Sequence, residues 1–236
     1  MPIDINCDLG EGMGNDTQIM PYISSCNIAC GGHYGDKASI IETIQLAQKH
    51  QVKVGAHPSF PDKLNFGRKI IEVSDNDLYE SLCQQILLFS ECCGKLGATM
   101  HHVKLHGALY NLAAKDTQTA QVVLKALNCC CKGIVLYAPY QSVLADLAQA
   151  DFKIMHEAFA DRRYHSTLQL VSRDRNDAVI TDAKSAWEHM ASMIENNKVK
   201  TVEREFVDIK ADTFCVHGDQ PHALELVQYI NRKLMT

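Results

Sequence analysis

Acidic residues, histidines and a lysine recur at the ends of short apolar runs in this chain, often beside glycine. The residues that could act as acids, bases or ligands are Asp8, Glu11, His33, His57, Lys104, His106, Glu157, Asp161, Arg162, His217 and Asp219. Neighbouring glycines permit tight turns and a close approach of the backbone to a ligand. We therefore take these residues as the candidate functional set.

Three members of this set are suited to a metal ion. Asp8, His33 and His57 offer one carboxylate and two imidazoles. Such a mixed set suits zinc, manganese or iron, with positions left open for water or substrate. The ligands are distant in sequence and carry no spacing motif such as HExxH. A metal-free alternative therefore stays open, in which the same groups act as acid, base and hydrogen-bond donors around a polar small molecule.

Lys104 and His106 stand two residues apart on one apolar run. Side chains on a strand repeat with a period of two, so both point to the same side of the sheet. A buried lysine there needs a carboxylate partner, for which Glu157, Asp161 and Asp219 are candidates. A purely structural ion pair is the alternative to a functional role.

Short β-type runs alternate with helical patterns almost from end to end. The runs cover residues 3–9, 26–30, 52–57, 102–106, 134–138, 152–159 and 213–217. Helices are expected over 37–50 and from the N-cap candidate Ser74 to about Lys95. This alternation is typical of repeated βα units around a parallel sheet.

In barrels and in open α/β sheets, functional groups gather at the carboxyl ends of the strands. Six of the seven runs deliver a polar or ionisable group to that end. The pattern alone does not choose between a closed barrel and an open sheet. Because no linker or composition step divides the chain, we expect one domain over residues 1–236, with 161–183 as a site-forming loop.

The composition excludes several classes of protein. The net charge of −5 argues against a nucleic-acid surface, and no apolar run approaches the ~18 residues that cross a bilayer. The first residues lack the basic and apolar regions of a leader, so we expect a cytoplasmic protein. The ten cysteines include no CxxC pair and are interpreted as reduced, structural thiols. No GxxxxGK[ST] or strand-borne GxGxxG motif is present to bind ATP.

Taken together, the motifs resemble the LamB/YcsF family. The resemblance is carried by residues 4–12, 27–31, 35–36, 55–58, 66–68, 103–111, 157–164 and 215–219. It implies a fold similar to the seven-stranded parallel (β/α) barrel of the glycoside hydrolase/deacetylase type. Two departures are Gly32, Tyr34 and Lys37 in place of the family's usual Phe, Ala and Pro, and a segment 166–177 without the family's glycines.

The resemblance also implies a function, that of the A subunit in an ATP-dependent 5-oxoprolinase. Such an enzyme opens the lactam of 5-oxo-L-proline to L-glutamate, with ATP hydrolysed, in a complex with subunits B and C. We expect ATP to be bound with those partners and a divalent metal to be an additional candidate cofactor. Two alternatives are a metal-dependent hydrolase or deacetylase acting alone, and a non-catalytic scaffold for the partner subunits.

Roles follow for the candidate residues under this hypothesis. The catalytic group comprises Asp8, Glu11, His57 and His106, which would activate a water or hold the developing oxyanion. The substrate-binding group comprises Lys104, Glu157, Asp161, Arg162, His217 and Asp219. Within the second group, Lys104 or Arg162 is expected to bind the substrate carboxylate.

Overall fold

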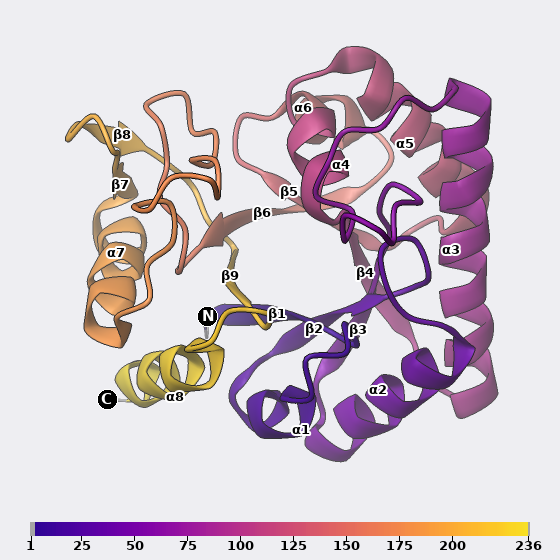
Figure 1. Ribbon diagram of the computed structural model, residues 1–236, viewed down its shortest axis with the longest axis horizontal. Helices are drawn as coiled ribbons and strands as arrows, with labels where there is room; N and C mark the ends of the chain where they lie inside the picture. The colour runs from indigo at the N-terminus through magenta and orange to yellow at the C-terminus, as the bar shows by residue number, and fades with distance from the viewer. Residues whose placement is uncertain (1–2, 236) are drawn as a thin grey trace.

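Seven parallel strands form a closed barrel in a computed structural model that describes residues 3–235 (Figure 1). Residues 1–2 and 236, at the ends of the expected domain, lie outside the described part. The strands are β1 (Asp4–Leu9), β2 (Ser25–Ala29), β3 (Lys53–His57), β4 (Met100–Lys104), β5 (Val135–Pro139), β6 (Lys153–Phe159) and β9 (Thr213–His217). The barrel closes where β9 pairs with both β1 and β6. The expected parallel barrel is thus confirmed.

Helices surround the barrel on its outer side (Figure 1). They are α1 (Asp16–Ile19), the 3-10 helix η1 (Met20–Tyr22), α2 (Lys37–His50), α3 (Asp75–Leu96), α4 (Gly107–Ala113), α5 (Thr117–Cys130), α6 (Val143–Ala148), α7 (Ala183–Asn196) and α8 (Ala223–Leu234). The helix expected over 37–50 is confirmed. At the start of α3, the Ser74 hydroxyl accepts a hydrogen bond from the Asp77 amide at 3.1 Å, as an N-cap does.

Strand side chains alternate between the helical layer and the barrel interior. On β1, Ile5, Cys7 and Leu9 belong to the apolar core beneath the helices. Asn6 and Asp8, in between, bond to residues of other strands across the interior. This period of two follows from strand geometry. The α/β barrel therefore has an apolar outer layer and a polar centre.

The centre of the barrel is filled by a network of hydrogen bonds between strands. The Asn27 side-chain amide of β2 donates to Asn6 and to Asp8, both at 2.8 Å. On β4, His102 lies 2.7 Å from the Asn27 carbonyl oxygen and stacks on Tyr137 with ring centroids 4.0 Å apart. Buried polar groups need such partners, since leaving one unpaired costs about 1–3 kcal/mol. The network fixes the floor beneath the strand ends.

Some elements were not expected from the sequence. A short antiparallel hairpin of β7 (Lys198–Lys200) and β8 (Phe206–Asp208) precedes β9. Strands of three residues give too little alternation to be recognised locally. The segment expected as a long irregular loop does lie between β6 and α7. No helix in residues 3–235 is long and apolar enough to span a bilayer.

Candidate active site at the barrel mouth

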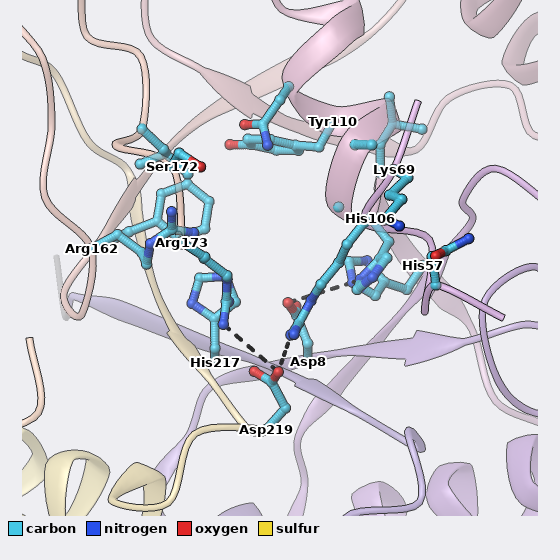
Figure 2. A pocket seen from close by; sticks show the side chains of 18 of the residues that line it. Asp8, His57, Lys69, His106, Tyr110, Arg162, Ser172, Arg173, His217 and Asp219 are labelled. Carbon is cyan, nitrogen blue, oxygen red and sulfur yellow. Dashed lines mark hydrogen bonds and ion pairs between the residues drawn. The ribbon is translucent and has the colours of Figure 1, made fainter. Parts of the chain in front are cut away.

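A cavity of about 520 Å³ opens where the strands end (Figure 2). Among the residues that line it are eight of the eleven candidates: Asp8, Glu11, His57, Lys104, His106, Arg162, His217 and Asp219. The remaining three, His33, Glu157 and Asp161, are buried close behind the lining. Parallel strands bring their carboxyl ends to one edge, which is why residues so distant in sequence meet here.

A tight loop contact positions His106. Gly107 has a φ of +57°, and a Cβ at this glycine would collide with the backbone of Gly67. The Ala108 amide donates to the Gly67 carbonyl at 2.9 Å, which holds the loop against the start of α4. The Phe66 carbonyl is then placed 2.9 Å from His106 Nε2. A residue other than glycine at 107 would disturb this arrangement.

One carboxylate and three imidazoles form a buried cluster on one side of the cavity. Glu11 Oε1 lies 2.9 Å from His33 Nε2 and 3.4 Å from His106 Nδ1. His57 Nε2 lies 2.9 Å from His106 Nδ1, and His33 stacks on His106 at 3.6 Å between centroids. Ligand atoms of all four residues lie within 4.8 Å of one another. This group shares His33 and His57 with the metal set expected from sequence, and has Glu11 and His106 in place of Asp8.

The hydrogen bonds of two histidines determine which ring nitrogens are free. His57 Nδ1 lies 2.8 Å from the Lys104 carbonyl, and His106 Nε2 lies 2.9 Å from the Phe66 carbonyl. A carbonyl only accepts, so both nitrogens carry hydrogen. In neutral rings, His57 Nε2 and His106 Nδ1 then face each other as lone pairs beside Glu11. Metal-ligating histidines commonly donate their second nitrogen to a carbonyl in this way.

Electrostatics favour neutral rings at this cluster. Burial, with a smaller effect of the charge on His57, lowers the pKa of His33 to about 2. Burial, followed by the charges on His33 and His57, also holds the pKa of His106 well below its usual range. Burial and the nearby Asp8 charge raise the pKa of Glu11 well above its usual range. Converging lone pairs and a carboxylate that lacks a cation are the donor set that a divalent metal requires.

Lys104 forms the second centre, at the floor of the cavity. Its ammonium lies 2.8 Å from Asp8 Oδ1 and 3.0 Å from Glu157 Oε1, and its side chain is 2% exposed. Burial raises the pKa of Asp8, but the charges on His57 and Lys104 outweigh burial and hold it well below its usual range. Asp8 Oδ2 lies 3.5 Å from His57 Nε2, so this ionised carboxylate connects the two centres.

On the opposite side of the cavity, Asp161 holds His217. Asp161 Oδ1 lies 2.9 Å from His217 Nδ1, and Asp161 Oδ2 accepts from the His217 backbone amide at 3.0 Å. Burial raises the pKa of Asp161, yet the neighbouring His217 lowers it below its usual range. A carboxylate on Nδ1 fixes the orientation of the imidazole and leaves Nε2 free for a ligand.

Arginines complete the wall, and two of them were missed as site residues. Figure 2 shows Arg162 and Arg173 on the same side as His217, across the cavity from His57. Arg68 and Arg173 both pair with Asp219. Arg68 stands in one of the matching family segments, which was an available signal. Arg173 lies in an irregular loop, and its local sequence gives no sign of its position.

The comparisons place the chain among known proteins. The model of the LamB/YcsF family matches residues 3–236. The chain belongs to the LamB/YcsF family. A protein of Staphylococcus carnosus, named as the A subunit of 5-oxoprolinase, is 42% identical over 240 residues, covering 99% of this chain and 95% of its own length. One of the same name from Bordetella pertussis is 40% identical over 238 residues, covering 98% of this chain and 94% of its own length.

A solved structure shares the fold of this LamB/YcsF protein. The lactam utilization protein from Thermus thermophilus superposes with a TM-score of 0.91 at 35% identity, covering 100% of this chain and 96% of its own. The departure at Tyr34 has a structural explanation. A Cβ at Gly12 would collide with the Tyr34 ring, so glycine at that position makes room for tyrosine at the rim.

Proposed function

We propose that this protein is the A subunit of an ATP-dependent 5-oxoprolinase that opens the lactam of 5-oxo-L-proline to L-glutamate. Its curated relatives carry that name over nearly their whole length, and the solved neighbour is named for lactam utilization. The observation that carries the proposal is the cavity itself. It combines an ionised carboxylate, histidines and arginines around a space suited to a small polar molecule.

The substrate requires a cation for its carboxylate. Lys104 is enclosed by Asp8 and Glu157, so we assign this role to Arg162 rather than to Lys104. The Arg162 Nη2 group donates to the Val171 carbonyl at 2.6 Å, which anchors the side chain. Its Nε has no hydrogen-bond partner among the described residues and is therefore the donor left for a ligand.

Ring opening requires a base for water and an acid for the leaving nitrogen. Asp8, ionised beside His57, is the base in this proposal: it takes a proton as the water oxygen bonds to the lactam carbon. Lys104, next to Asp8, stabilises the negative charge that develops on the carbonyl oxygen. His217, oriented by Asp161, delivers a proton to the nitrogen as the C–N bond breaks. Each acid or base contributes about 100- to 10,000-fold in rate.

A metal and ATP have separate places in the proposal. Glu11, His57 and His106 would hold a divalent cation, with His33 orienting Glu11, and such a cation supplies Lewis-acid polarisation of an oxygen. ATP would drive opening of an unactivated amide by phosphorylating its carbonyl oxygen. Because the chain has no phosphate-binding loop motif, we assign ATP binding to a complex with subunits B and C.

Reconstitution tests the proposal. The chain is mixed with purified subunits B and C, and glutamate and phosphate are followed from 5-oxoproline and ATP, with each component omitted in turn. We expect release only when all three are present. A folded complex that releases neither product, or one that is equally active without this chain, contradicts the assignment.

The histidine cluster also favours a second candidate, a metal-dependent amide hydrolase or deacetylase that needs no partner. Hydrolysis of amide or acetyl substrates by the metal-loaded chain alone, without ATP, would support it. A scaffold role without catalysis is the third alternative. Binding of 5-oxoproline to the isolated chain, measured by calorimetry, would count against that role.

A further inference from the structure

Three thiols gather in the helical layer, away from the residues that line the barrel mouth. Cys83 lies on α3, and Cys129 and Cys130 end α5, the helix packed against it (Figure 1). Their sulfur atoms all lie within 4.8 Å of one another. Cys129 is exposed and the other two are partly buried, whereas the seven remaining cysteines are buried. These three thiols, the cysteine cluster below, are therefore the ones that solvent and ions can reach.

The surroundings of the cluster favour a thiolate. Tyr79 and Cys83 share one face of α3, and Lys125 and Cys129 share one face of α5, since residues four apart are neighbours on a helix. The Lys125 ammonium lies 4.5 Å from the centroid of the Tyr79 ring. A hydrogen bond from the Tyr79 hydroxyl lowers the pKa of the Cys129 thiol, and the Lys125 charge adds to this.

We propose that Cys83, Cys129 and Cys130 bind one thiophilic metal cation, Zn²⁺ or Cu⁺, through three thiolates. Soft thiolate ligands select these cations. With Zn–S bonds of about 2.3 Å, sulfur atoms around zinc lie roughly 3.8 Å apart, a separation that the observed cluster reaches with small side-chain movements. Three thiolates and Zn²⁺ leave one negative charge, which Lys125 is placed to offset.

The location of the site agrees with a cation. Cys129 and Cys130 stand in the last turn of α5, where unpaired carbonyls give the helix end a partial negative charge. Cys131 does not belong to the cluster, because it is buried and its thiol donates to the Leu127 carbonyl. The fourth coordination position is then open to water or another small ligand.

A disulfide uses these residues less well. Adjacent residues have Cα atoms about 3.8 Å apart, which is shorter than the ~4.4 Å minimum usual for a disulfide. Cys129 and Cys130 are therefore poor partners for each other. A bond from Cys83 to either one leaves the third thiol unpaired, whereas a cation engages all three.

Titration of the reduced full-length chain with Cd²⁺, a spectroscopic substitute for Zn²⁺, tests the proposal. We expect one equivalent to produce the thiolate-to-cadmium charge-transfer absorption. Cys83→Ser should weaken Cd²⁺ binding at this site at least ~10-fold. Cys131→Ser is the matched control, because a serine hydroxyl can also donate to the Leu127 carbonyl, and it should bind as the wild type does. Glu11→Gln should also keep the absorption, since that cluster contains no sulfur.

The exposed Cys129→Ser variant provides a second loss-of-ligand test if Cys83→Ser fails to fold. Competition by Zn²⁺ or by Cu⁺ then identifies the preferred cation. The proposal is overturned if the reduced chain gives no charge-transfer absorption, or if the absorption survives loss of Cys83 or Cys129. It is equally overturned if the cluster only forms a disulfide to Cys83 in air. None of these results depends on the lactam chemistry proposed above.

Discussion

At the scale of single residues, Asp8 connects the two centres of the site. It contacts Lys104 on one oxygen and approaches His57 with the other. We expect Asp8→Asn, which keeps the shape of the side chain, to lower the turnover of the reconstituted complex by about 100- to 10,000-fold. Glutamate release measures the effect, and the melting temperature of the variant controls for unfolding. Full activity in a folded variant would remove Asp8 from the mechanism.

Glu11 supplies the only carboxylate of the four-residue histidine cluster. Without its charge, three neutral imidazoles would hold a divalent cation less tightly, so we expect Glu11→Gln to weaken binding by at least ~10-fold. Equilibrium dialysis with Zn²⁺ or Mn²⁺ gives the affinity. Because thiols can also take up Zn²⁺, the comparison is made in the Cys83→Ser background. Asp161→Asn, on the opposite side of the cavity, should leave the affinity unchanged; equal losses in both variants would indicate no specific site.

At the scale of elements, the loop after β6 is anchored to the strand that it follows. The Phe159 amide donates to the Tyr164 hydroxyl at 2.7 Å, and the Tyr164 side chain is buried. Tyr164→Phe leaves this amide unpaired, which should lower the free energy of unfolding by about 1–3 kcal/mol. Urea denaturation measures the change.

Tyr140→Phe is the control for that variant. Tyr140 follows β5, and its ring contacts His156, but its hydroxyl makes no hydrogen bond with the described residues. We expect its stability to change by less than about 0.5 kcal/mol. Equal effects from the two substitutions would show that the Phe159 bond does not anchor the loop.

At the scale of the whole molecule, buried neutral histidines make stability depend on pH. Burial, with the charge on Arg163, lowers the pKa of His189 from 6.5 to about 4. The unfolded chain takes up this proton near pH 6.5 and the folded chain does not. Stability from His189 is therefore full above pH 6.5 and falls as the pH drops toward 4, by about 2 kcal/mol at pH 5.

Urea denaturation of the wild type and of His189→Gln at pH 7.5 and pH 5 tests this expectation. The wild type should lose about 2 kcal/mol more than the variant between the two values. His222→Gln, which changes an exposed imidazole, serves as the control for removal of a histidine. Parallel losses in the wild type and His189→Gln would mean that His189 is not kept neutral by burial.

The sequence by itself determined the elements and the end of the barrel that carries the site. Each of the seven expected runs is a strand, and every boundary agrees within two residues. Hydrophobic alternation, helical periodicity and capping are local, so the chain displays them without its partners. The rule that functional groups follow the carboxyl ends of strands then selected eight residues that do line the cavity.

Only the tertiary structure decided how those residues are grouped. Closure through the pairing of β1 with β9 joins the two ends of the chain, and no local pattern contains it. The partners of Lys104, the place of Arg173 and the meeting of Cys83 with Cys129 depend on how strands stagger and helices pack. Periodicity specifies the face on which a side chain lies. The residue that it meets there is specified by long-range packing.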